Sequence, residues 1–196
     1  MRMRGECYSL AFRVLHWSIA FVMLGMLITI LLRYTWLNKE GMSEIIMEYC
    51  TSQEVNMTKE KAIVLAKRLR ALMWEWHVYL GYTLMGLVFV RIILGMMGRV
   101  PFLNPFKRGI ILNTRIRAVI YLVFYVCVVI SIVSGVVLAL DIETAYNNEI
   151  KSIHFGSIYY FVTYLVIHFI GVLFAELSSD NGIVSRMING KSKYDL

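Results

Sequence analysis

The sequence is poor in charged residues and in proline for its 196 residues, and these shortages argue against a soluble protein. Only 17% of its residues are charged, whereas charged residues make up about a quarter of an average soluble domain. Hydrophobic residues reach 59%, an excess that one soluble core of this size cannot bury. The two prolines leave room for long uninterrupted helices. The lipid bilayer is therefore the expected solvent.

Cysteine is also scarce, because only Cys7, Cys50 and Cys127 occur, far apart in the chain. No CxxC pair is present, which excludes a thioredoxin motif and a zinc ribbon. No CxxCH is present either, so covalent attachment of a c-type haem is excluded. Any haem must then be held non-covalently, and we expect three unpaired thiols.

Four apolar runs are long enough to cross a bilayer, for which about 20 residues are needed. They span about residues 12–32, 76–97, 118–140 and 155–177. They predict an all-α integral membrane protein, a four-helix bundle in a single domain over residues 1–196. The first run is too long for the apolar part of a signal peptide and precedes no small-residue cleavage site, so we expect it to be retained.

The connection over residues 37–73 is long and polar. Its second half, 58–73, places apolar residues at helical spacing with basic residues between them. This pattern indicates either a helix lying at the membrane interface or an extension of the second membrane helix, and the sequence leaves both open.

Charge in the loops predicts the orientation in the membrane. The 98–117 loop carries five basic residues and no acid, whereas the 141–153 loop carries three acids and one lysine. The positive-inside rule then places both termini and the 98–117 loop in the cytoplasm, and the 37–73 loop outside. It also accounts for the net charge of +7. No basic stripe with interleaved aromatic residues favours nucleic acid, so lipid is the expected partner.

All four histidines lie in or at the ends of the predicted spans, at His16, His77, His154 and His168. Ionisable residues inside a membrane are costly and usually functional. One such histidine could serve as an interhelical hydrogen-bonding residue, but four of four would be an odd outcome on that interpretation. His154 and His168 are 14 residues apart, hence on one face and separated by about 21 Å along the axis.

The predicted depths pair the histidines in two levels. His16 and His168 (the inner pair) lie near the cytoplasmic face, and His77 and His154 (the outer pair) lie near the opposite face. Each pair is suited to be the axial ligands of one non-covalent b-type haem, because two imidazoles give a six-coordinate iron fit for electron transfer. A zinc or copper site would need three or four ligands in one small sphere, whereas these histidines split into two levels.

Charged side chains near the spans are candidate partners for haem propionates. Arg91 lies 14 residues after His77, on the same helix face but at the inner level, where inner-haem propionates would explain a buried arginine. Arg13, one turn before His16, is either a second propionate partner or a positive-inside anchor. Arg33 either serves the outer haem or extends its charge to the interface. Glu176 is either a quinone-protonating group or an interfacial carboxylate.

Three stretches resemble the bacterial cytochrome b561 family, which includes the cytochrome b subunits of nickel–iron hydrogenases. The first is "RVLHWS" around His16, and the second is "WEWHVYLGYTLMGLVFVRIILGMMG" with His77 and Arg91 in register. The third runs from His154 through "IHFIGVLFAELSSDNGIVSRMINGK". The resemblance implies a di-haem four-helix core in the bacterial inner membrane, ligated by the four histidines. Residues 37–73 match no motif and are a candidate docking surface for a periplasmic or membrane redox protein.

We therefore expect respiratory electron transfer between the quinone pool and a redox partner, as in the cytochrome b subunit of a hydrogenase or a similar oxidoreductase. A quinone is a candidate second cofactor. One alternative is a self-contained superoxide:quinone oxidoreductase, with Lys67, Arg68 and Arg70 before the second span attracting the anion. An alternative of another class is a non-haem membrane anchor or a proton-relay transporter.

Overall fold

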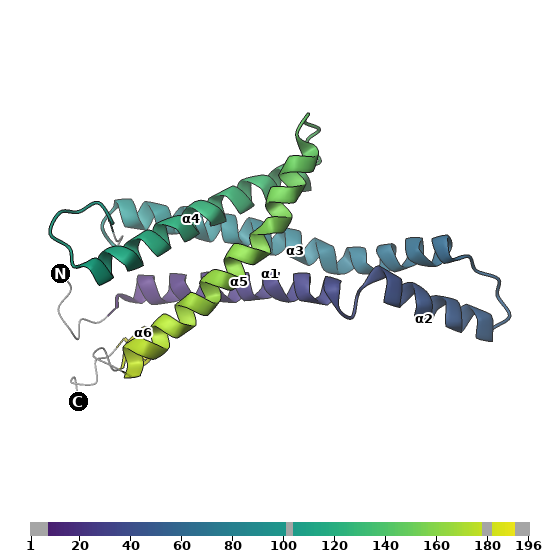
Figure 1. The fold of residues 1–196 in the computed structure, drawn as a ribbon, viewed down its shortest axis with the longest axis horizontal. Helices are drawn as coiled ribbons and strands as arrows, with labels where there is room; N and C mark the ends of the chain where they lie inside the picture. Colours follow the sequence, from purple (N-terminus) through teal and green to yellow (C-terminus); the bar gives the residue numbers. More distant parts are fainter. Residues whose placement is uncertain (1–7, 101–103, 178–181, 191–196) are drawn as a thin grey trace. The chain divides into compact units, whose positions relative to one another are not determined.

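The computed structural model describes residues 8–100, 104–177 and 182–190, and six α-helices lie within them (Figure 1). They are α1 (Leu10–Tyr34), α2 (Lys39–Ser52), α3 (Lys59–Met96), α4 (Leu112–Ala139), α5 (Asn147–Leu177) and α6 (Ile183–Asn189). These ranges contain no β-strand. The protein is thus all-α, as the sequence predicts.

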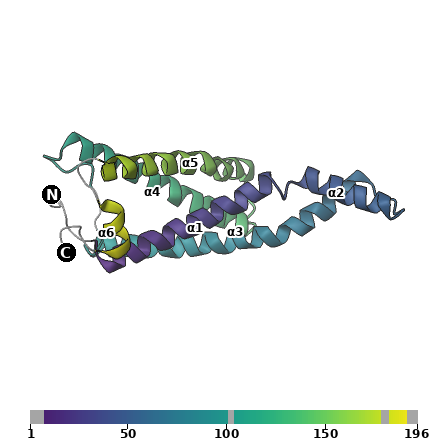
Figure 2. The ribbon, with the colours of Figure 1, turned by 90° about the horizontal axis from the view of Figure 1, so that it is seen from below.

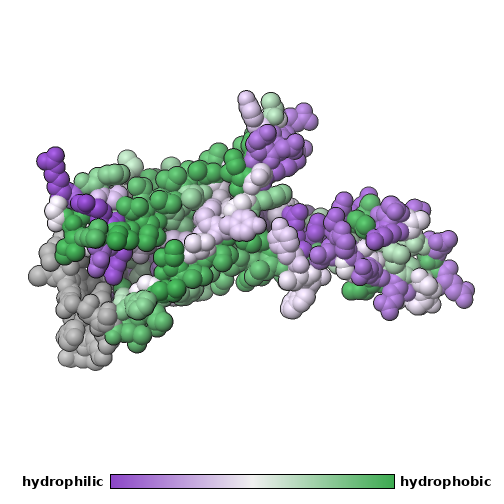
Figure 3. Space-filling model, in the orientation of Figure 1, coloured by the Kyte–Doolittle hydropathy of each residue, from purple (hydrophilic) through white to green (hydrophobic). Residues whose placement is uncertain are grey.

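Four of the helices, α1, α3, α4 and α5, are long and apolar enough to cross a membrane, and they cover the four apolar runs of the sequence to within one residue. In each of them, at most 17% of the most apolar stretch is buried inside the protein. Figure 3 shows apolar residues covering much of the helical surface. Exposure of so much apolar surface is unfavourable in water, whereas lipid solvates it. The fold is a multi-pass membrane helical bundle.

The chain divides into two compact units. Unit 1 comprises residues 1–19 and 85–196, and unit 2 comprises residues 20–84. In unit 1, α4 packs along α5, and α5 contacts α6. Unit 1 contains three of the histidines, His16, His154 and His168, and unit 2 contains His77.

The polar segment before the second span belongs to α3, which is one continuous helix of 38 residues. At about 1.5 Å per residue this helix is roughly 57 Å long, well above the ~30 Å of a bilayer's hydrocarbon core. Its charged first half therefore extends beyond the membrane. Of the two alternatives left open by the sequence, the structure shows the extension of the membrane helix.

Helix α2, which the sequence analysis does not predict, forms a hydrophilic hairpin with residues 59–73 of α3. The two segments lie side by side in both ribbon views (Figures 1 and 2), and Figure 3 shows the hairpin as mostly hydrophilic. Three small residues, Ser43, Ala62 and Ala66, are completely buried. Small buried side chains let two helices approach closely, which explains how so polar a segment packs.

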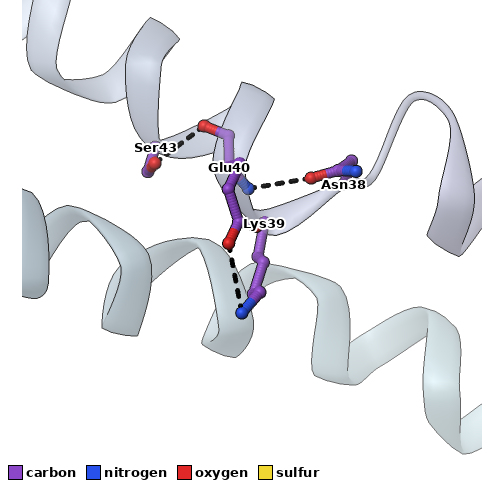
Figure 4. A network of polar contacts seen from close by, with 4 residues as sticks. All are labelled: Asn38, Lys39, Glu40 and Ser43. Atoms are coloured by element: carbon purple, nitrogen blue, oxygen red, sulfur yellow. Dashed lines mark hydrogen bonds and ion pairs between the residues drawn. The ribbon is translucent and has the colours of Figure 1, made fainter.

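The start of α2 is fixed by local polar contacts (Figure 4). The Asn38 side chain accepts a hydrogen bond of 2.9 Å from the Glu40 backbone N–H, as expected of a helix N-cap. The Ser43 hydroxyl donates to the Glu40 carbonyl at 2.7 Å, and Lys39 pairs with the Glu40 carboxylate at 3.2 Å. Glu40 also places negative charge at the positive end of the helix dipole.

Candidate cofactor sites

The structure brings His16 of α1 and His168 of α5 together within unit 1. Their ring centroids are 6.1 Å apart, and the ring planes are tilted by 41°. Aromatic side chains support both rings: Phe12 stacks on His16 at 6.4 Å, and Tyr164 stacks on His168 at 5.8 Å. Two imidazoles from facing helices thus meet at one depth.

This separation matches the requirement of a six-coordinate haem iron. An imidazole nitrogen binds a first-row metal at about 2 Å, and the ring centre lies about 1 Å farther away. Two imidazoles on opposite sides of one iron therefore have centroids about 6 Å apart. The spacing of the His16 and His168 rings therefore fits a b-type haem held between them.

Arg91 lies beside this pair. Its guanidinium carbon is 5.2 Å from the Phe12 ring centroid and 5.5 Å from that of Tyr125, and Arg91 is close enough to His16 for their charges to interact. A guanidinium held against aromatic rings is oriented by them, and its remaining N–H donors can still bind an anion. A cation is therefore available to an anionic group bound near His16.

Arg13 joins the start of α1 to the carboxyl end of α6. Its Nη1 donates to the Ile188 carbonyl at 2.7 Å, and the indole Nε1 of Trp17 donates to the Met187 carbonyl at 3.1 Å. A Cβ at Gly190, where φ is +75°, would lie 2.7 Å from the Arg13 guanidinium carbon. Among the described residues, the buried Nε of Arg13 has no acceptor. One end of this guanidinium thus binds protein, and one donor remains for another group.

His154 rests against α4. Its Nδ1 lies 3.2 Å from the Ser131 carbonyl oxygen and 3.2 Å from the Ser134 hydroxyl. At Gly135 an ideal Cβ would lie only 2.8 Å from Cε1 of the ring. The absence of a side chain at Gly135 therefore lets the imidazole approach the α4 backbone.

His77, in unit 2, is buried and has its own polar partner. Its Nδ1 lies 2.8 Å from the Thr29 hydroxyl, and Trp74 stacks on the ring at 4.6 Å with an interplanar angle of 8°. The Arg33 guanidinium lies over the Trp74 ring at 4.9 Å. Arg33 is therefore separated from the His77 ring by one indole.

The hydrogen-bond partners favour one tautomer of the His77 and His154 rings. The Thr29 hydroxyl donates its only hydrogen to the Met26 carbonyl at 2.6 Å, so it accepts from Nδ1–H of His77. The Ser131 carbonyl can only accept, so Nδ1 of His154 is also protonated. Nε2 of each ring then carries no proton, which is the tautomer in which an imidazole can bind a metal.

Thr29, Ser131 and Ser134 are functional candidates that no sequence pattern indicates. Serine and threonine are ordinary residues in membrane helices, and they commonly hydrogen-bond across helices. The signal that could have found Thr29 is depth, because it lies near the outer end of its span, at the level predicted for His77.

Two further observations limit other assignments. In the described part of the chain, no three His, Cys, Asp or Glu side chains converge on one point, as a zinc centre would need. Glu176 accepts hydrogen bonds from the backbone N–H groups of Gly182 at 3.0 Å and Val184 at 3.4 Å. Its carboxylate therefore caps the start of α6, a structural role at the end of the span.

An α-helical membrane bundle with a facing pair of imidazoles is typical of membrane b-type cytochromes. The sequence model of the prokaryotic cytochrome b561 family matches residues 7–190, and the chain belongs to this family. No curated protein sequence and no solved structure was found to match it. Membership makes the protein a membrane b-type cytochrome in electron transfer, and it confirms the resemblance seen in the sequence.

Proposed function

We propose that this cytochrome binds two b-type haems, one at each histidine pair, and carries electrons across the bacterial inner membrane between the quinone pool and a redox partner. The observation that supports this most strongly is the 6.1 Å separation of the His16 and His168 rings. This spacing is the one expected of two imidazoles that bind one iron from opposite sides.

At the inner site, the protein supplies ligands and charge compensation. His16 and His168 would be the axial ligands, and Arg91 beside them would bind a propionate. The Nε of Arg13, a buried donor with no acceptor among the described residues, would bind a second propionate oxygen. When bound, the haem supplies a one-electron ferric/ferrous couple, and these side chains hold it in place and tune it.

At the outer level, the proposal rests on sequence depth. His77 and His154 belong to different units, and their pairing follows from the predicted ends of their helices. Nδ1 of each ring is hydrogen-bonded, which favours the tautomer with the lone pair on Nε2 that an axial ligand requires. The two environments support the ligand role of each histidine separately.

The proposed orientation places both termini in the cytoplasm and the hydrophilic hairpin on the outer side. The part of α3 in the hairpin lies outside the bilayer, because the whole helix is longer than the bilayer is thick. We therefore propose it as the docking surface for a periplasmic or membrane redox protein, such as the partner subunit of a hydrogenase.

The direct test is a reduced-minus-oxidised absorbance spectrum with haem quantitation on the detergent-purified protein. We expect two low-spin b-type haems per chain. His168→Ala should remove the inner haem and His154→Ala the outer one, each leaving one haem. Tyr159→Phe, at an exposed position of α5, is the matched control and should keep both. One haem in the unaltered protein, or two haems in His168→Ala, would overturn the assignment of ligands.

A second candidate is a superoxide:quinone oxidoreductase, which one observation favours. Arg33 lies one indole away from His77, and Arg70 is near enough to Arg33 for their charges to interact. Such cations would attract superoxide to the outer haem. Rapid haem reduction by superoxide would favour this function, and no reaction would dismiss it. The non-haem alternatives lose support, because the family implies haem.

A further inference from the structure

The two histidine levels differ in the hydrogen bonding of their rings. At the outer level, His77 donates Nδ1–H to Thr29, and His154 donates Nδ1–H to the Ser131 carbonyl and the Ser134 hydroxyl. At the inner level, His16 and His168 contact aromatic rings. Within the described ranges of the chain, neither inner ring makes a hydrogen bond. Both outer rings therefore differ from both inner rings in their hydrogen bonding.

We propose that Thr29 and Ser134 are positioning residues that direct Nε2 of the outer histidines toward iron and hold the outer haem at a lower reduction potential than the inner haem. The proposal rests on the two-haem function above. It adds a direction to that function, because electrons would then move downhill from the outer level to the inner level.

The physical cause is the electron density on the imidazole. A ring that donates its Nδ1–H to an oxygen becomes a more basic ligand at its other nitrogen. A more basic ligand stabilises ferric iron relative to ferrous iron, which lowers the potential of the one-electron couple. The carbonyl of Ser131 and the hydroxyls of Thr29 and Ser134 would therefore all lower the potential of the outer haem.

The surroundings of the inner histidines favour a higher reduction potential. The inner histidine rings stack on aromatic side chains and, among the described residues, donate no Nδ1–H to an oxygen, so they gain no such basicity. The Arg91 guanidinium close to His16 favours the iron state with one positive charge fewer, which is ferrous. Both levels therefore contribute to the same difference in potential.

The test is a spectroscopic redox titration of the purified di-haem protein, resolved into a lower and a higher step. Thr29→Val should raise the midpoint potential of the lower step. The expected rise is a threefold to tenfold change in equilibrium constant, or about 28–59 mV for one electron. The higher step should stay in place. Thr29→Ser keeps the hydroxyl and should restore the lower step to its original potential.

Matched variants exclude a general effect of losing a hydroxyl. Thr83→Val removes a hydroxyl that bonds only its own helix, at the Tyr79 carbonyl, and should shift neither step. Ser134→Ala leaves the Ser131 carbonyl as an acceptor for His154, so it should raise the lower step by less than Thr29→Val does. If Thr29→Val loses its haem, Ser134→Ala decides the question.

Several outcomes would overturn the proposal. One is a lower step that stays in place although both haems remain low-spin; another is a shift of the higher step instead. A failure of the proposed function looks different, because the unaltered protein would then contain fewer than two haems or show no low-spin bands. The haem count before titration separates the two cases.

Discussion

The His154 ring lies so close to Gly135 that a methyl group there would lie 2.8 Å from Cε1. Gly135→Ala must therefore displace the ring or α4, and overpacking of this kind costs about 1–3 kcal/mol. The ring cannot move away and keep both of its hydrogen bonds to α4. We expect this variant to retain the inner haem and lose most of the outer one, measured as haem per chain.

The control for this substitution is Gly41→Ala in the hydrophilic hairpin. Gly41 is also helical, but a Cβ there meets no atom within 4 Å. This variant should keep both haems and gain slightly in helix propensity. Equal haem content in the two variants would contradict the placement of His154 against α4.

Arg91 allows a second prediction for a single residue. Arg91→Gln removes a positive charge near His16, which stabilises ferric iron and lowers the inner-haem potential. At the effective dielectric of partly buried sites the change is on the order of 1 kcal/mol, or about 40 mV for one electron. Arg91→Lys keeps the charge and should shift the potential less. An unchanged potential in Arg91→Gln, measured by redox titration, would remove Arg91 from the site.

How far the sequence predicts the site depends on how rare each residue type is in a membrane. His16, His168 and Arg91 are identifiable because ionisable residues seldom occur in spans. The partner of His77 is not, because Thr29 is an uncharged residue that lies 48 positions away. The close approach at Gly135 is equally hidden, since one glycine among several has no special sequence signal.

At the scale of elements, the hydrophilic hairpin makes a separate prediction, because it packs through small residues. Ala66 is fully buried in the part of α3 beside α2. Ala66→Leu should push the two helices apart, at a cost of about 1–3 kcal/mol. Faster hydrogen exchange of the α2 backbone amides, with an unchanged haem spectrum, is the expected result.

Ala71→Leu, on an exposed face of the same helix, provides the matched control and should leave exchange in α2 unaltered. If the α2 amides of both variants exchange hydrogen at the same rate as in the unaltered protein, α2 does not pack on α3 through Ala66. If the haem spectrum of Ala66→Leu also changes, the hairpin is not independent of the cofactor sites.

The sequence predicts the long helices better than the short ones, for a physical reason. An apolar run of about 20 residues has no stable state in water, so its composition alone identifies a span. Helix α2 is short, much less apolar than the spans, and contains Gly41, so its composition alone does not identify it. Its signal is local, namely Asn38 as the N-cap and Glu40 in the first turn. Whether α3 was continuous could not be decided from sequence, because an interfacial helix shows the same amphipathic pattern.

At the scale of the whole molecule, the proposed orientation can be tested with the cysteines already present. Cys50 lies in α2 and Cys127 in the apolar helix α4, and both are free thiols. The N-terminus, with Cys7, is predicted to be cytoplasmic. A membrane-impermeant maleimide added to intact spheroplasts should therefore label Cys50. Cys7 should react only after permeabilisation, and Cys127, surrounded by lipid and protein, should react in neither case. Single-cysteine variants with the other two changed to serine separate the three signals. Labelling of Cys7 but not Cys50 in intact spheroplasts would invert the orientation, and the hydrophilic hairpin would then face cytoplasmic rather than periplasmic partners.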